Sequence, residues 1–176
     1  MTHRTCLVLV AAAALAVAPG ARADSRVELA ALTGVSGQKS VRTLRDMRFL
    51  DMTPQRYDFS CGSAALASLL SSGYGLETTE EDLIRWMMEG ADTREIIRNG
   101  FSMLDMKRYV EHLPGFRAHG FKVDADALYR LQMPVIALLD VKGYKHFVVV
   151  KGASAGRVFV ADPSLGHRVM NEQDFV

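Results

Sequence analysis

Cys61 is the residue whose type and setting most strongly suggest chemistry. Apolar residues follow it at helical spacing, which places Cys61 in the first turn of a helix. Backbone N–H groups and the positive end of the helix dipole favour a thiolate at such a position. Gly62 leaves room for a backbone beside the sulfur, and Gln55, six residues upstream, carries an amide that can donate to an oxyanion. The alternative interpretation is a buried structural cysteine.

A nucleophilic cysteine needs a base, and His146 is the strongest candidate among the histidines. It begins an apolar strand, 147–150, where an imidazole has little reason to lie without a partner. His112, at the end of a polar helix, and His119, in a loop, indicate solvated surface positions. Asp162 follows a later strand, and two adjacent antiparallel strands would place it beside His146 to orient the imidazole. Taken alone, an aspartate before a proline is only a turn signal.

The elements that must position these residues follow from hydrophobic periodicity. We expect helices over 61–73, over 78–88 behind a capping box that starts at Thr78, from Ser102 to before Pro114, and around 125–131. Residues 41–50 are expected to be extended or partly helical. Four short strands linked by glycines are expected at 135–139, 146–150, 157–160 and 167–170. This order predicts an α+β fold, with N-terminal helices packed on one side of a C-terminal antiparallel sheet and a cleft between the two halves.

Composition narrows the classes of function. The 176 residues are 49% hydrophobic and 23% charged, which excludes wholesale disorder. Lys and Arg total 21 against 20 acidic residues, so a nucleic-acid-binding surface is not expected. No Cys or His pair has the spacing of metal ligands, and we expect neither a metal nor a cofactor.

Residues 1–23 have the layout of a secretory signal peptide. A basic start leads into an apolar run that ends at Ala18, and small residues at Ala21 and Ala23 form a cleavage site. The run is too short to span a membrane. Cleavage would remove two arginines and no acid, giving a net charge of −1 and leaving Cys61 as the single cysteine. A lone thiol in an exported protein pairs with another chain, lies in the core or does chemistry. We therefore expect export, most simply to the periplasm, with no membrane span in the mature chain.

Several blocks occur in a fixed order along the chain. They are Gln55–Leu66 (QRYDFSCGSAAL), Gly100-Phe101-Ser102 before a helix, Leu128 to Pro134 with Ile136, His146-Phe147-Val148-Val149, and Asp162-Pro163 with Gly166. Together, over residues 40–176, these blocks resemble the papain-like cysteine peptidases that cut double-glycine leaders from bacteriocins.

The resemblance implies a papain-like fold and a role for each matching residue. By position, Cys61 would be the nucleophile, His146 the base, Asp162 the orienting residue and Gln55 the oxyanion donor. Residues expected to contact the peptide substrate are Ser60, Gly62 and Tyr144. The family usually has Asp immediately before the Cys, whereas this chain has Ser60, with Asp58 nearby, so the role of that acid is open.

We expect a peptidase domain over 51–176 after an N-terminal arm, 24–50. The end of the chain soon after the fourth expected strand leaves open whether a closing strand is missing. The expected activity is that of a cysteine endopeptidase acting on a peptide or leader of an exported protein, linked to an export system such as functional-amyloid or bacteriocin secretion. Two alternatives remain: a catalytically silent peptide-binding module and an acyl transferase. A redox role is disfavoured, because no second cysteine would resolve a disulfide. The oligomeric state is open.

Overall fold

The computed structural model of the chain describes residues 26–28 and 38–175. The expected signal peptide, 1–23, lies outside the described residues. The chain divides into two compact units, Met1–Val41 and Arg42–Val176. In the first unit, β1 (Arg26–Glu28) pairs antiparallel with β2 (Gln38–Ser40), within the segment expected to be a loose arm.

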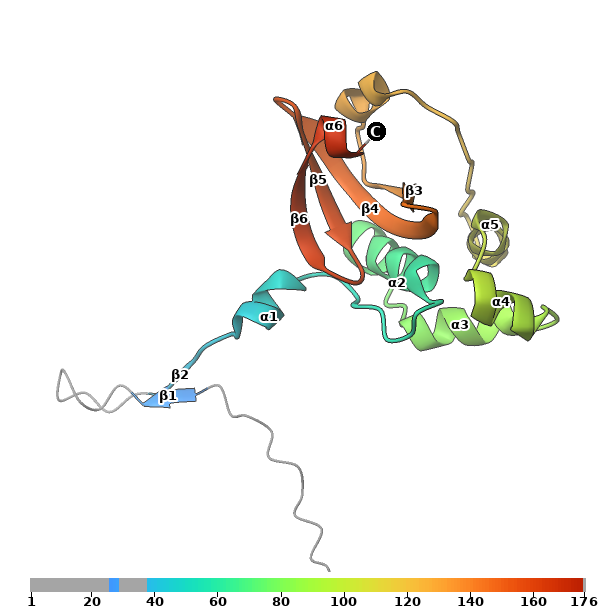
Figure 1. Cartoon of the computed structure of the whole chain (residues 1–176). Helices are drawn as coiled ribbons and strands as arrows, with labels where there is room; N and C mark the ends of the chain where they lie inside the picture. Colours follow the sequence, from blue (N-terminus) through green and yellow to red (C-terminus); the bar gives the residue numbers. More distant parts are fainter. Residues whose placement is uncertain (1–25, 29–37, 176) are drawn as a thin grey trace, which may run out of the picture. The chain divides into compact units, whose positions relative to one another are not determined.

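The second unit runs from helices to a sheet, in the expected order (Figure 1). Its helices are α1 (Leu44–Arg48), α2 (Cys61–Ser68), the π-helical η1 (Leu69–Gly73), α3 (Glu80–Met88), α4 (Thr93–Asn99), α5 (Met103–His112) and the 3₁₀-helical η2 (Ala125–Arg130). The expected helices are confirmed, and α4 is an addition that periodicity did not predict. The N-cap of α3 is Thr79, whose side chain accepts from the Asp82 N–H, so the cap lies one residue later than expected.

The sheet contains β3 (Val135–Val141), β4 (Tyr144–Ser154), β5 (Arg157–Asp162) and β6 (Gly166–Asn171), antiparallel in that order, and is followed by α6 (Glu172–Phe175). The prediction that the second strand begins at His146 is wrong by two residues. Lys142 and Gly143 both have positive φ, as a two-residue hairpin turn requires, so pairing already begins between Val141 and Tyr144.

The helix α2 lies between the sheet and the helices α3 and α5. All its residues are buried; one side packs on β4, and α3 and α5 pack against it (Figure 1). Phe147 and Val149 of β4 belong to this core, whereas Val148 and Val150 belong to a second cluster on the opposite face. The expected one-sided packing holds for α2, α3 and α5, while η2 packs on β4 and α6 on β5 and β6.

The segment that includes α1 is attached to the start of β6. The His167 side chain hydrogen-bonds the Leu50 carbonyl, with Nε2 2.6 Å from the oxygen. Arg48 lies against Gly166, where an added Cβ would be 2.2 Å from the Arg48 Cγ. Because Gly166 also has φ of +84°, both the space and the backbone conformation require glycine there.

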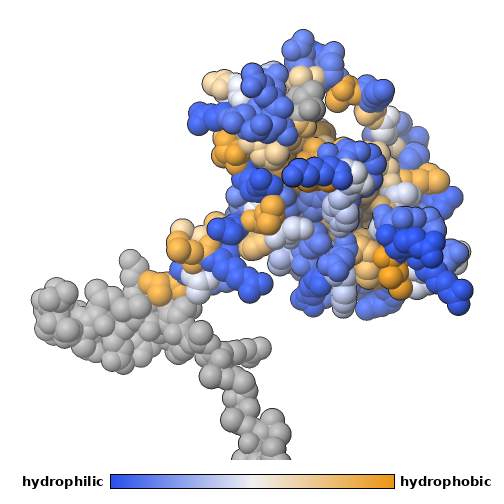
Figure 2. Space-filling view, in the orientation of Figure 1, coloured by the Kyte–Doolittle hydropathy of each residue, from blue (hydrophilic) through white to orange (hydrophobic). Residues whose placement is uncertain are grey.

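The face shown in Figure 2 is mostly hydrophilic, with hydrophobic residues exposed in small groups. Within residues 26–28 and 38–175, no helix has the length and apolar character needed to cross a membrane. The same part of the chain contains no cluster of three or more His, Cys, Asp or Glu arranged to hold a metal ion.

Candidate active site

Cys61 is the first residue of α2, as the sequence predicts. Its side chain is a free thiol and is 5% exposed. The preceding Ser60 is the N-cap, and its carbonyl accepts the first helical bond, from the Ala64 N–H at 2.9 Å. The thiol therefore lies at the positive end of a buried helix, where a negative charge is stabilised.

Two opposing effects act on the Cys61 thiol. Burial raises its pKa, whereas hydrogen bonds from His146 and from the backbone N–H groups of Phe147 and Gly62 lower it, together with the positive charge on His146. The pKa of Cys61 ends below the ordinary value for cysteine. These are the conditions under which a cysteine becomes a nucleophile.

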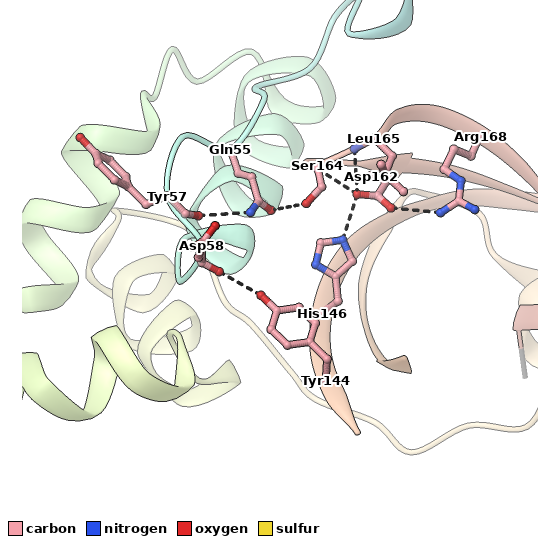
Figure 3. A network of polar contacts seen from close by, with 9 residues as sticks. All are labelled: Gln55, Tyr57, Asp58, Tyr144, His146, Asp162, Ser164, Leu165 and Arg168. Carbon is pink, nitrogen blue, oxygen red and sulfur yellow. Dashed lines mark hydrogen bonds and ion pairs between the residues drawn. The ribbon is translucent and has the colours of Figure 1, made fainter. Parts of the chain in front are cut away.

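His146 and Asp162 form a buried pair on neighbouring strands. The His146 Nε2 lies 2.9 Å from Oδ1 of Asp162, and both side chains are at least 90% buried (Figure 3). Since Nε2 faces Asp162, Nδ1 is the ring nitrogen left for the Cys61 thiol. Burial lowers the pKa of His146, but the hydrogen bonds to Asp162 and Cys61 raise it to about 9. The two shifts together favour a thiolate–imidazolium pair.

Asp162 is held by more than His146. Its Oδ1 also accepts from the backbone N–H groups of Ser164 and Leu165, at 2.9 and 3.2 Å, and its Oδ2 lies 3.4 Å from Nη1 of Arg168 (Figure 3). Burial raises the pKa of Asp162, but the hydrogen bonds from His146 and the backbone lower it below its usual range. Asp162 is thus a fixed, ionised acceptor for the imidazole.

Gln55 joins the segment before α2 to the turn after β5. Its backbone N–H donates to the Pro163 carbonyl at 2.9 Å, and its side-chain oxygen accepts from the Ser164 hydroxyl at 2.8 Å. The amide nitrogen donates to the Tyr57 carbonyl at 3.1 Å (Figure 3). That bond uses one of the two amide protons, so the group retains a second proton for an oxyanion.

Tyr144, the first residue of β4, connects the sheet to the segment before α2. Its hydroxyl donates to the Asp58 carbonyl at 3.0 Å, and its ring stacks near His146 with centroids 6.3 Å apart (Figure 3). Burial, and then the negative charges of Cys61 and Asp58, raise the pKa of the Tyr144 phenol. The side chain is 55% exposed, consistent with its expected contact with substrate.

Ser60 and Gly62 were expected to contact the substrate, but both face the interior of the protein. Ser60 is 0% exposed and its hydroxyl is bonded within the protein, so its side chain has a structural role in place of the predicted substrate contact. Gly62 faces the core: an added Cβ would be 3.2 Å from the Phe147 ring and 3.4 Å from the Met106 sulfur. A side chain at this position would therefore crowd Phe147, and Gly62 serves the site through its N–H.

Sequence reasoning missed three supporting residues. Ser164 follows Asp162 at the spacing of an aspartate turn, which is a usable signal. Arg168 reaches Asp162 from β6, and Glu80 contacts Ser60 from α3, so both depend on tertiary packing.

The block Gly100-Phe101 also supports the site. The Phe101 ring packs edge-on against the Phe59 ring, with centroids 6.1 Å apart. Gly100 has φ of +76°, and an added Cβ would lie 3.2 Å from the Phe59 carbonyl oxygen. These contacts explain how a block distant in sequence helps to position the residues before Cys61.

Comparison with known proteins agrees with this arrangement. Residues 50–176 match the peptidase C39 family. The chain is 44% identical over 138 residues to a probable functional amyloid protease FapD of Pseudomonas fluorescens, covering 78% of this chain and 61% of the relative. A probable functional amyloid protease FapD of Pseudomonas aeruginosa is 46% identical over 130 residues, 74% of this chain and 57% of the relative. The chain therefore spans about three fifths of the length of these relatives.

The fold is also found among solved structures. The peptidase domain of Streptococcus ComA, described as a bi-functional ABC transporter involved in a quorum sensing pathway, superposes with a TM-score of 0.59 at 24% identity. The match covers 71% of this chain and 88% of that domain. The expected papain-like α+β fold, with helices before an antiparallel sheet, is confirmed.

Proposed function

Because the chain belongs to the peptidase C39 family, we propose that it is a cysteine endopeptidase that uses Cys61 as its nucleophile. The observation that carries this proposal is the buried His146–Asp162 pair, with Nε2 2.9 Å from Oδ1, together with the buried thiol of Cys61 at the first position of α2, whose pKa His146 lowers. Each of these three groups has its pKa shifted in the direction that the reaction needs: down for Cys61, up for His146 and down for Asp162.

In the first half of the reaction the thiolate attacks the scissile carbonyl carbon. A C–S bond forms and the carbonyl electron pair moves to oxygen, where the Cys61 N–H and the Gln55 amide stabilise the oxyanion. As the tetrahedral intermediate collapses, the C–N bond breaks and His146 gives its proton to the leaving amine. The product is a thioester on Cys61.

In the second half a water molecule attacks the thioester. The now neutral His146 takes a proton from the water, the C–S bond breaks, and the thiolate re-forms beside the imidazolium. Throughout, Asp162 keeps the ring oriented, with Nε2 turned away from the thiol.

We propose a substrate with small residues at the cleavage point, carried by a protein of an export system. The sequence blocks that resemble the peptidases of double-glycine leaders support a Gly-Gly junction. Tyr144, whose hydroxyl donates to the Asp58 carbonyl, is the side chain expected to contact that substrate. The relatives named functional amyloid protease point to a component of functional-amyloid export.

The test uses synthetic peptides that carry a Gly-Gly junction and matched peptides with Ala-Ala or Val-Val at the same place, with the products identified by mass. Two hydrolysis fragments from the Gly-Gly peptide, absent with Cys61→Ala, support the peptidase. A new amide in the presence of an added amine would indicate acyl transfer. Binding of the peptides without any product would indicate a binding module.

We further propose that residues 1–23 direct export to the periplasm and are then removed. The basic start, apolar run and small-residue cleavage site support this proposal. The mass of the protein isolated from a periplasmic fraction should place Asp24 at its N-terminus. Recovery of the intact chain from the cytoplasm would contradict it.

A further inference from the structure

Glu80 is an acid in an unusual place. It is the first residue of α3, where Glu81 and Asp82 also lie, yet it alone of the three turns into the protein and is 1% exposed. A buried carboxyl is costly unless hydrogen bonds replace its water. The hydrogen-bond partners of Glu80 therefore indicate why its carboxyl group is buried.

Both donors to Glu80 come from the segment that leads into Cys61. The Oε1 atom lies 2.5 Å from the Ser60 hydroxyl and accepts from the Arg56 backbone N–H at 3.1 Å. The Ser60 hydroxyl also accepts from the Tyr57 N–H at 3.1 Å, and the Ser60 N–H donates to the Tyr57 carbonyl. One carboxyl thus holds the loop 56–60 at both of its ends.

This loop connects the two proposed oxyanion donors. Gln55 lies at its start, and its amide is bonded to the Tyr57 carbonyl inside the loop. Cys61, with its backbone N–H, follows Ser60 directly. A shift of the loop would move the two donors relative to each other, and misplacement by about 1 Å can cost as much as about 10²-fold in rate.

The second carboxyl oxygen of Glu80 indicates that packing alone does not explain why this position is a glutamate. Glu80 Oε2 is buried and has no hydrogen-bond partner among the described residues. An apolar side chain of the same shape would avoid leaving that oxygen unsatisfied. A buried polar atom left in this state calls for an explanation other than stability.

We propose that Glu80 is a positioning residue for the oxyanion donors, acting through Ser60 and the Arg56 N–H. The inference rests on the proposed function, because it assigns Glu80 to the reaction at Cys61. Glu80 is far along the chain from the loop and reaches it only through the packing of α3 on α2.

The test compares Glu80→Met, which keeps the length but removes the acceptors, with Glu95→Met as the matched control. Glu95 is an exposed acid in the first turn of α4, and its carboxylate accepts from the Asn99 side chain, away from the loop 56–60. Hydrolysis of the Gly-Gly peptide is measured well below the Tm of each variant. We expect kcat to fall by up to about 10²-fold in Glu80→Met with KM within about twofold of wild type. Glu95→Met should match wild type, and Glu80→Gln, which keeps an acceptor oxygen, should recover most of the loss.

A second readout separates positioning from general damage. The pH profile of Cys61 alkylation by iodoacetamide should be unchanged in Glu80→Met, because His146 and Asp162 come from the sheet. Ser60→Ala should reproduce the loss in kcat, and adding it to Glu80→Met should cost little more, since both act through one contact.

Several results would overturn the inference. Equal kcat in folded Glu80→Met and Glu95→Met would do so, as would a parallel loss of thiol reactivity. If Glu80→Met does not fold, Ser60→Ala carries the test, and failure of both variants to fold would assign the pair to stability instead. A wild-type chain that hydrolyses no peptide would refute the proposed function itself, whereas activity that is insensitive to Glu80 would refute only this inference.

Discussion

His146 and Asp162 meet across two neighbouring antiparallel strands, with the imidazole Nε2 2.9 Å from the carboxylate Oδ1. The register pairs Val149 with Ala161, so Asp162 lies diagonally from His146 on the same face of the sheet. The three other groups that bind Asp162, two backbone N–H groups and Arg168, come from the turn after β5 and from β6. The imidazole is therefore oriented by the sheet, and the thiol by α2.

Asp162→Asn should narrow the pH range of activity. His146 and two backbone N–H groups all donate to Oδ1, so the asparagine oxygen should take that position and keep the imidazole oriented. Loss of the charge lowers the pKa of His146 from about 9, and the rate falls as pH rises through that pKa because the leaving amine needs the imidazolium proton. The alkaline limb of kcat/KM should move to lower pH.

General acid–base catalysis typically accelerates a reaction by about 10²–10⁴-fold, and the loss in kcat for this variant should be smaller than that factor. Asp174→Asn, in the exposed helix α6, is the control and should leave the profile in place. An Asp162→Asn profile identical to wild type would show that the carboxylate charge does not act on His146.

Alkylation of Cys61 by iodoacetamide should reveal a thiolate below neutral pH. The pKa of an ordinary thiol is about 8.5, and the pKa of a His-paired thiol at a helix start is far lower, about 4 in the strongest cases. Thiol reactivity requires the deprotonated form, so it should persist below pH 7 in wild type and move to higher pH in His146→Ala. A thiol that titrates near 8.5, or reacts only on unfolding, would make Cys61 structural and favour the binding module.

Cys61→Ala should abolish hydrolysis while the fold remains. The side chain is small and buried, and its removal should change the free energy of unfolding by about 1 kcal/mol. Thermal unfolding followed by circular dichroism checks the fold, and peptide binding by the inactive variant checks the cleft. Turnover at the wild-type rate in this variant would eliminate Cys61 as the nucleophile.

Gln55→Ala should lower kcat by about 10²–10³-fold, the usual cost of losing one oxyanion donor. The matched control is Ser164→Ala, which removes the same bond between Ser164 and Gln55 but leaves the amide protons. The control should retain most activity. Equal losses in the two variants would mean that Gln55 serves only to hold the turn after β5.

The helices and strands with strong hydrophobic periodicity could be predicted from the sequence, and so could the residues that act through their own chemistry. Cys61 and His146 could be predicted because a thiol at a helix start and an imidazole in an apolar strand are each locally unusual, whereas Asp162 was predicted from its expected place beside His146 on an adjacent strand. The helix α4 was missed because it is seven residues long and buries only Ile96, which leaves no periodic pattern to detect.

Residues that act by tertiary contact were beyond the reach of sequence patterns. Glu80 looks like one more acid in the first turn of α3, and only the packing of α3 on α2 shows that it turns inward. Ser60 and Gly62 were expected to contact substrate, but the Ser60 side chain is buried and a Cβ at Gly62 would meet the core residues Phe147 and Met106.

The attachment of α1 to β6 sets a practical limit on how far the protein can be shortened. The family match starts at residue 50, yet Arg48 packs on Gly166, and the Leu50 carbonyl binds His167. Gly166 closes the turn that begins at Asp162, and the Ser164 and Leu165 N–H groups of that turn donate to the Asp162 carboxylate. A chain trimmed to residue 50, where the family match begins, would lose the Arg48 contact on one side of that turn. The smallest unit that keeps this support therefore includes Arg48 and Leu50, and the compact unit that contains them begins at Arg42.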